Sequence, residues 1–304
     1  MIECAMKSLR DKVVKRLWLI SDLQQSIPEN ATACMTAGVE DFRTLNLKCD
    51  GICYLGDAVE GSRIEFLHEM TSMQIEKLGS LNTPVYYAMG NHDMDYLRST
   101  GEPHQPFYET VRELDTWHTQ LTAQDMYFTK DWGEFVMVFF GAHAAEDASW
   151  HTTNGTVRRD AEKYPYYDKA DELRAMLASF DKPVFTLCHY GFPGANRGNE
   201  LFGRILPLPD NVRMHIYGHA HIGDGMWAGK DLYRKVACVD NQQIPQVNIA
   251  SLENRRGSAV RSAIFEYYED GTVGIYFRNH TEHRWDEMYM QRAMEAPPVR
   301  VPKE

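Results

Sequence analysis

The sequence predicts a mixed α/β sandwich built from one domain. Through most of the chain, short apolar runs rich in β-branched or aromatic residues alternate with helix-like stretches, which is typical of strands joined by helices. Towards the C-terminus, Asp270-Gly271 separates two apolar segments, a pattern that favours an antiparallel hairpin. Neither a repeat nor a Pro/Gly/Ser-rich linker divides the chain, so we expect one domain over residues 1–295 and a polar, Pro-containing tail over 296–304.

The expected elements follow from these patterns. Buried strands are predicted at Arg16–Ser21, Gly51–Leu55, Pro84–Met89, Glu134–Gly141, Pro183–Cys188, Val212–Tyr217 and Gln246–Ala250. Helices are predicted at Ala31–Asn46, Ser62–Leu78, Pro106–Leu121 and Ala170–Phe180. The hairpin pairs Ala259–Tyr268 with Thr272–Asn279 through a two-residue turn. Met94–Pro106 and His143–Asp168 are expected to be irregular loops of the kind that form lids or binding loops.

The composition narrows the classes of partner. The chain has 304 residues, 43% of them hydrophobic, which excludes a disordered or fibrous protein. Its net charge of −11 argues against nucleic acid or an anionic membrane as a partner, because both need a basic face. The N-terminal stretch lacks the apolar run of a signal peptide, so we expect a cytoplasmic protein. Scattered cysteines without a C-x-x-C pair are expected to be reduced thiols: Cys4, Cys34, Cys49, Cys53, Cys188 and Cys238.

Polar side chains follow five of the predicted strands at the point where each strand ends. In α/β sheets, ligands bind beyond the carboxyl ends of the strands, so these side chains are expected to converge on one crevice. They are Asp22 and Gln24, Asp57, Asn91 with His92 and Asp93, His189, and His219 with His221.

So many carboxylates and imidazoles in one place require a cation to neutralise them. They are too numerous for one tetrahedral zinc ion, and a structural zinc site would normally use thiolates. The number suits two divalent metals that share a bridging carboxylate. The spacing supports this hypothesis, because Asp22/Gln24 and His219/His221 are i, i+2 pairs that an extended backbone points to the same side.

The ordered motifs D-x-Q, G-D-x-x-E, G-N-H-D, a lone strand-end histidine and G-H-x-H resemble those of the calcineurin-like metallophosphoesterase superfamily. The resemblance implies a four-layer α/β/β/α sandwich of two mixed β-sheets flanked by helices. It also implies two metal sites that share Asp57. The first would be held by Asp22, Gln24, Asp57 and His221, and the second by Asp57, Asn91, His189 and His219.

The resemblance also assigns roles to three further residues. His92 would face the scissile phosphoester and aid the leaving group, while a hydroxide that bridges the metals attacks phosphorus. Asp93 would orient or charge His92 from behind, and Glu60 would hold its loop.

Gln24 departs from the family, because most members have histidine at this position. An amide oxygen is a harder and weaker ligand than imidazole, so the first site should prefer Mn²⁺ or Mg²⁺, with Mn²⁺ the leading candidate and Fe or Zn as alternatives. The same D-x-Q variant occurs in the manganese-dependent ADP-ribose/CDP-alcohol diphosphatase branch. Alternatively, Gln24 makes the first metal labile and leaves a weak or mononuclear enzyme.

The predicted activity is that of a phosphodiesterase or nucleotide diphosphatase acting on small phosphorylated molecules. Gly61-Ser62 follows G-D-x-x-E in place of the Asp-Arg-Gly of Ser/Thr protein phosphatases. Arg197, in the glycine-rich Gly191–Gly198 loop, is a candidate for binding substrate phosphate, and Arg158-Arg159 is a weaker one. A metal-poor protein-binding scaffold on the same fold and a nuclease are the alternatives, the latter disfavoured by the acidic balance. The sequence leaves the oligomeric state open.

Overall fold

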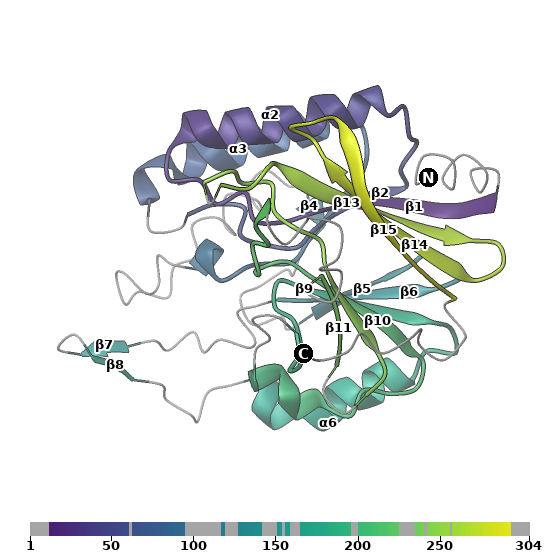
Figure 1. Cartoon of the computed structure of the whole chain (residues 1–304). Coiled ribbons are helices and arrows are strands. Elements are labelled where there is room, and N and C mark those ends of the chain that lie inside the picture. Colours follow the sequence, from purple (N-terminus) through teal and green to yellow (C-terminus); the bar gives the residue numbers. More distant parts are fainter. Residues whose placement is uncertain are drawn as a thin grey trace.

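A computed structural model of the chain shows two facing β-sheets with helices on their outer faces (Figure 1). The structure describes residues 12–60, 63–94, 117–118, 127–141, 151–153, 156–158, 165–195, 200–224, 235–239, 242–255 and 257–292. The three α-helices of this part are α2 (Pro28–Thr44), α3 (Leu67–Gly79) and α6 (Pro165–Ala178). Short 3₁₀ turns lie at η2 (Ile64–Phe66), η3 (His92–Met94) and η6 (Glu200–Ile205).

One sheet has seven strands in the order β15-β14-β13-β1-β2-β3-β4. Their bounds are β1 (Val13–Ile20), β2 (Gly51–Tyr54), β3 (Val85–Tyr87), β4 (Trp117–His118), β13 (Arg261–Tyr268), β14 (Thr272–Asn279) and β15 (Arg284–Arg292). The strands β1, β2, β3 and β4 run parallel, while β13, β14 and β15 add an antiparallel meander, so the sheet is mixed.

The second sheet has six strands in the order β11-β12-β10-β9-β6-β5. Their bounds are β5 (Tyr127–Asp131), β6 (Val136–Phe140), β9 (Val184–Cys188), β10 (Val212–Tyr217), β11 (Val236–Cys238) and β12 (Pro245–Asn248). Its central strands β6, β9, β10 and β12 are parallel and the outer pairs are antiparallel. A separate two-stranded ribbon joins β7 (His151–Thr153) to β8 (Thr156–Arg158).

The four layers follow from the alternation of side chains along the strands. In β1, Leu17 and Leu19 pack between the sheets against residues such as Phe185, whereas Trp18 and Ile20 point to the opposite face under α2 and α3. A third apolar cluster lies between the second sheet and α6. Both faces of each sheet are therefore buried, as expected of sheets with parallel central strands, and the predicted four-layer fold is confirmed.

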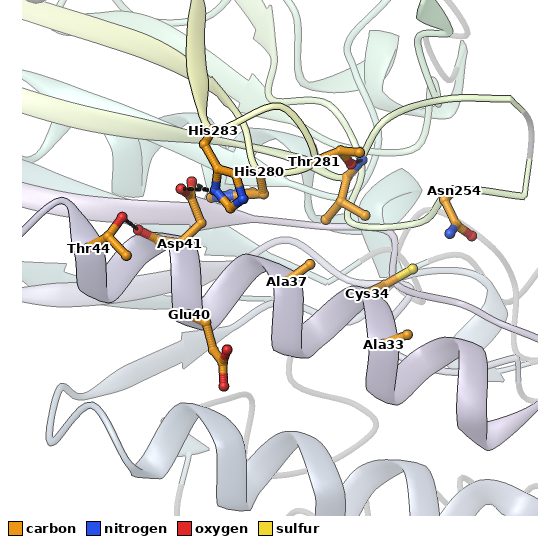
Figure 2. Close-up of a pocket in the computed structure, with 11 residues that line it drawn as sticks. Ala33, Cys34, Ala37, Glu40, Asp41, Thr44, Asn254, His280, Thr281 and His283 are labelled. Atoms are coloured by element: carbon orange, nitrogen blue, oxygen red, sulfur yellow. Dashed lines mark hydrogen bonds and ion pairs between the residues drawn. The ribbon is translucent and has the colours of Figure 1, made fainter.

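Helix α2 covers the first sheet because its apolar residues recur at helical spacing. Pro28 occupies its first turn, where the missing amide hydrogen costs nothing. Its buried Asp41 ties the helix to the strands, since Arg278 donates to both carboxylate oxygens at 2.8 Å and His280 and His283 contact them at 2.8 and 2.7 Å. Figure 2 shows Asp41 facing the two histidines at the edge of a pocket of about 520 Å³.

All seven strands predicted from apolar runs are present, with ends that differ by a few residues. Two regions need correction. Trp117 and His118 form β4 inside the range expected to be helical, and the rest of Pro106–Leu121 lies outside the described residues. His143–Asp168, expected to be irregular, contains β7, β8 and the first turn of α6, whereas Met94–Pro106 lies outside the described residues beyond Met94.

The C-terminal hairpin is present, but its turn is one residue longer than predicted. Three residues, Glu269 to Gly271, connect β13 to β14, and Gly271 has φ +78°, the left-handed conformation that ends a three-residue loop. The strand β15 extends this meander and was not predicted, because its polar residues mask the alternation.

The five cysteines in the described part of the chain are free thiols, as predicted. None of the described helices combines the length and apolar composition that crossing a bilayer requires.

Candidate functional site

The polar residues that follow the strand ends meet at one edge of both sheets. The neighbouring parallel strands β1, β2 and β3 of the first sheet, and β9 and β10 of the second, deliver their carboxyl ends to this edge. Asp22 and Gln24 follow β1; Asp57 and Glu60 follow β2; Asn91, His92 and Asp93 follow β3; His189 follows β9; and His219 and His221 follow β10.

Four of these residues have a positive φ angle, a backbone conformation that residues other than glycine rarely adopt. The φ angles are +57° at Asp22, +51° at Asp57, +63° at His219 and +44° at His221. Asp and His tolerate the left-handed region better than most residues, but each instance still costs about 1–3 kcal/mol. Such strain persists only where the surrounding structure imposes it, and it gathers at functional sites.

Two glycines let the loops after β2 and β3 approach one another. A Cβ atom on Gly56 would collide with the backbone of Gly90, and Gly56 itself has φ +79°. A Cβ atom on Gly90 would collide with the backbone and carboxylate of Asp57. The glycines of both motifs are therefore needed to bring Asp57 beside Asn91.

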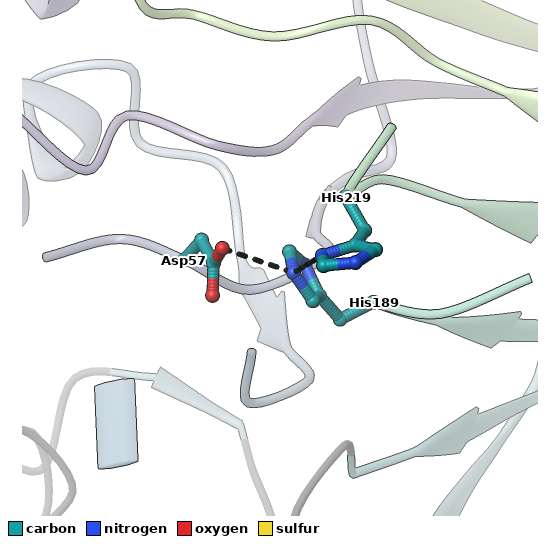
Figure 3. Close-up of side chains that lie close together, drawn as sticks. All are labelled: Asp57, His189 and His219. Carbon is teal, nitrogen blue, oxygen red and sulfur yellow. Dashed lines mark hydrogen bonds and ion pairs between the residues drawn. The ribbon is translucent and has the colours of Figure 1, made fainter. Parts of the chain in front are cut away.

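One group of ligand atoms surrounds Nε2 of His189. This nitrogen lies 3.0 Å from Asp57 Oδ2, 3.1 Å from Asn91 Oδ1 and 3.2 Å from His219 Nδ1. Figure 3 shows the rings of His189 and His219 edge to face, with Asp57 on the other side of His189. His189 Nδ1 donates to the Leu55 carbonyl at 2.8 Å, so in the neutral ring Nε2 presents its lone pair to the other three ligands.

The other group, which corresponds to the first predicted metal site, is built around Asp22 and shares Asp57 with the His189 group. Ligand atoms of Asp22, Asp57 and His221 lie within 4.8 Å of one another, as do those of Asp57, His189 and His219. Asp22 Oδ1 is 3.1 Å from His221 Nε2, and Glu253 Oε1 lies 2.5 Å from the opposite ring nitrogen, Nδ1. A carboxylate behind the imidazole is the usual support of a metal-ligating histidine.

The Gln24 amide lies between Arg255 and Asp57, the residue that both groups share, and its oxygen and nitrogen can be assigned in two ways. In one, its oxygen faces Asp57 Oδ2 and its nitrogen faces Arg255, so that acceptor meets acceptor and donor meets donor. In the other, the nitrogen donates to Asp57 and the oxygen accepts from Arg255 Nη2 at 2.7 Å. A cation shared with Asp57 requires the first orientation, since only the oxygen can ligate it.

The pKa values of three candidate ligands show how the charges in the site affect one another. Burial by itself would lower the pKa of His189, but the neighbouring Asp57 carboxylate raises this pKa to about 9. Burial by itself would raise the pKa of Asp57, but His189 holds this pKa well below its usual range. Burial and the neighbouring His189 lower the pKa of His219 to about 3, so its ring is neutral and able to ligate. The buried oxygen and nitrogen ligands therefore fit divalent metal ions.

His92 and Glu60 form a pair beside the two groups. His92 Nδ1 lies 2.9 Å from Glu60 Oε1, and the His92 backbone amide donates to Asp57 Oδ1 at 2.8 Å. The His92 side chain is 28% exposed, so it can be reached from solvent.

The contacts of Asp93 and Glu60 differ from those expected. Asp93 is fully buried and accepts hydrogen bonds from the amides of Gly90, Asp57 and Val59 and from the Tyr87 hydroxyl. Burial and the Asp57 charge raise the pKa of Asp93 to about 7. Asp93 therefore holds the loops, as was expected of Glu60, while Glu60 contacts His92, as was expected of Asp93. Glu60 follows β2 and Asp93 follows β3, and the sequence does not show how the two loops fold against each other.

Sequence reasoning missed Glu253 and Arg255 as members of the site. Both follow β12, which is parallel to β10, so the strand-end rule that selected the other residues could also have selected these two. Of the candidate phosphate ligands, Arg197 and Arg159 lie outside the described residues, and only the backbone of Arg158 is described, in β8.

Comparisons with known proteins agree with the fold. The sequence profile of the calcineurin-like phosphoesterase family matches residues 15–223, a range that includes every predicted metal ligand. No curated protein sequence matches the chain. A dimetal phosphatase from Danio rerio shares its fold at 14% identity with a TM-score of 0.62, over 88% of this chain and 97% of that one. A purple acid phosphatase from yellow lupin (Lupinus luteus) seeds is similar at 12% identity with a TM-score of 0.55, over 95% of this chain and 56% of that one. Together, the family match and the fold show that this chain belongs to the calcineurin-like phosphoesterase family and is a metal-dependent phosphoesterase.

Proposed function

We propose that this chain is a dinuclear-metal phosphoester hydrolase that acts on small phosphodiesters or nucleotide diphosphates. The observation that carries the proposal is the pair of ligand groups that share Asp57. A carboxylate common to both groups can bridge two adjacent metal ions. The first ion would be held by Asp22, Gln24, Asp57 and His221, and the second by Asp57, Asn91, His189 and His219. When bound, two such ions neutralise the phosphoryl oxygens and make a water molecule more acidic.

Mn²⁺ is the metal that we propose. Gln24 contributes a neutral amide oxygen where an imidazole would favour zinc, and Asn91 and the aspartates add further oxygen ligands. The ligand side chains Asp22, Asp57 and His189 are fully buried, so their interaction with a cation is weakly screened by solvent.

The residues around the ligands suggest how the chain assists the reaction. A water-derived oxygen forms a bond to phosphorus while the bond from phosphorus to the leaving oxygen breaks. His92 donates a proton to that leaving oxygen, and Glu60 orients the ring through Nδ1, so that the opposite nitrogen faces the substrate. The backbone amide of His92 donates a hydrogen bond to Asp57, which holds His92 at a fixed position beside the proposed metal sites.

A small, negatively charged substrate is favoured over a nucleic acid. The net charge of −11 opposes long-range attraction of a polyanion, whereas a small phosphoester can be bound by the metals themselves. The D-x-Q motif supports a nucleotide diphosphate as the leading candidate among small substrates.

Metal analysis and a substrate panel test the proposal. The purified protein should bind close to two Mn²⁺ ions per chain and hydrolyse at least one of bis-p-nitrophenyl phosphate, ADP-ribose and CDP-choline. Asp131→Asn, an exposed carboxylate away from the site, is the matched control for Asp57→Asn and should retain both properties. A chain that binds no divalent metal and hydrolyses none of these compounds would contradict the proposal. Turnover of single-stranded DNA alone would favour a nuclease.

A further inference from the structure

Arg255 contacts three different supports of the site. Its Nε donates to Glu253 Oε2 at 2.5 Å, and Glu253 lies against His221. Its Nη1 lies 3.3 Å from Glu60 Oε2, and Glu60 holds His92. Its Nη2 reaches the Gln24 amide oxygen at 2.7 Å when that amide is turned towards it. One guanidinium thus connects a histidine ligand, an amide ligand and the residue expected to aid the leaving group.

The segment that carries Arg255 is held firmly in place. The amides of Leu252 and Glu253 donate to the carbonyls of Ser21 and Asp22 at 2.9 and 3.1 Å, which attaches the segment to the end of β1. On its other side, Asn254 accepts from Gln25 at 3.3 Å and lines the pocket beside α2 in Figure 2. The backbone before Arg255 is therefore fixed beside the end of β1, and contacts with Glu253 and Glu60 hold the Arg255 guanidinium next to Gln24.

The two partners of the Gln24 oxygen exclude one another. When the oxygen accepts from Arg255, the amide nitrogen faces Asp57 and nothing on Gln24 can ligate a cation there. When the oxygen faces Asp57, the amide nitrogen and the Arg255 guanidinium oppose each other as two donors. Gln24 is fully buried, so water cannot easily relieve the mismatch of this second orientation.

We propose that Arg255 is a positioning residue that competes with the metal ion of the first site for the Gln24 amide oxygen and makes this site the weaker of the two. The inference rests on the proposed function, because it requires the first site to bind a metal. A hydrogen bond to a charged donor is strong enough for the competition to weaken metal binding about ten- to a hundredfold. Arg255 would thereby set the Mn²⁺ concentration at which the first site is filled.

The test measures Mn²⁺ binding by calorimetry and by the electron paramagnetic resonance of free Mn²⁺, neither of which depends on turnover. Arg255→Met should tighten the weaker binding step about ten- to a hundredfold and leave the tighter step within about twofold. Arg63→Met, which removes an exposed arginine that is 45% accessible, should bind Mn²⁺ like the wild type. Thermal unfolding confirms that each variant is folded.

A double-mutant cycle separates competition from the simple loss of a positive charge. In a Gln24→Ala background there is no amide oxygen to compete for, so Arg255→Met should change the weaker step by only a small factor. Equal tightening in both backgrounds, or no tightening in either, would overturn the role of Arg255 while leaving the metal sites intact. A wild-type chain that binds no Mn²⁺ would instead refute the proposed function.

Discussion

Replacement of Glu60 by alanine tests the contact between Glu60 and His92, which the sequence did not predict. The substitution removes the carboxylate oxygen that lies 2.9 Å from His92 Nδ1, together with one acceptor of Arg255 at 3.3 Å. His92 keeps its backbone hydrogen bond to Asp57, so the ring should lose its orientation without leaving the site.

The expected size follows from the exposure of the pair. A hydrogen bond to a charged group contributes about 1.5–3 kcal/mol, and the lower part of this range applies because His92 is 28% exposed and Glu60 13%. If this interaction supports only the transition state, kcat should fall about ten- to thirtyfold, with little change in KM. The metal content should not change, since Glu60 belongs to neither group of candidate metal ligands.

The assay compares two leaving groups in the presence of Mn²⁺. p-Nitrophenolate departs with little need of a proton, so the loss should be larger for an unsubstituted phenyl ester than for the p-nitrophenyl ester. Glu65→Ala, which removes a carboxylate that is 55% exposed five residues along the chain, is the matched control and should be fully active.

A double-mutant cycle with His92→Ala decides whether Glu60 acts through His92. The single change His92→Ala should lower kcat by about 10²–10³ without loss of metal. In that background Glu60→Ala should have little further effect. If Glu60→Ala costs the same factor with and without His92, or if it empties the metal sites, then the pairing does not have the role inferred from its geometry.

Three further substitutions test other parts of the structure. Asp57→Asn should abolish binding of both metal ions, measured by elemental analysis, because Asp57 is the carboxylate common to both groups; retention of one ion at full occupancy would contradict a shared ligand. Asp93→Asn should lower the free energy of unfolding by about 2–3 kcal/mol in denaturant, because the new amide nitrogen would face backbone amides that now donate to a carboxylate. If the variant instead keeps its stability and loses only the assistance to the leaving group, the role predicted from the sequence is favoured. Asp41→Asn should destabilise the fold by about 3 kcal/mol, because it leaves the buried Arg278 without its ion pair. Although burial alone would raise it, hydrogen bonds from Arg278 and His280 hold the pKa of Asp41 well below its usual range, so this stabilisation is complete above about pH 4 and is lost as the pH falls further. The difference in Tm between wild type and Asp41→Asn should therefore be constant near neutral pH and shrink in acid.

Much of the fold could be predicted from local patterns. Each apolar run that was long enough to be buried on both faces, such as Val184–Cys188 in β9 and Val212–Tyr217 in β10, forms a strand. The strands that escaped prediction are short or polar. Trp117–His118 has two residues, and Arg284–Arg292 carries charges along its length, so pairing with a neighbour decides their conformation rather than their own sequence.

The residues of the candidate site could also be selected from the sequence, because the end of a parallel strand is recognisable locally and the sheet brings such ends together. Asp22, Asp57, Asn91 and His189 meet for this reason. The residues that contact His92 and Gln24 could not be predicted in this way. Whether Glu60 or Asp93 faces His92 depends on how the loops after β2 and β3 fold over each other, and Arg255 reaches Gln24 across a long stretch of intervening chain. Sequence spacing reports which side chains a strand end carries, whereas contacts between loops depend on packing between distant segments, and that information exists only in three dimensions.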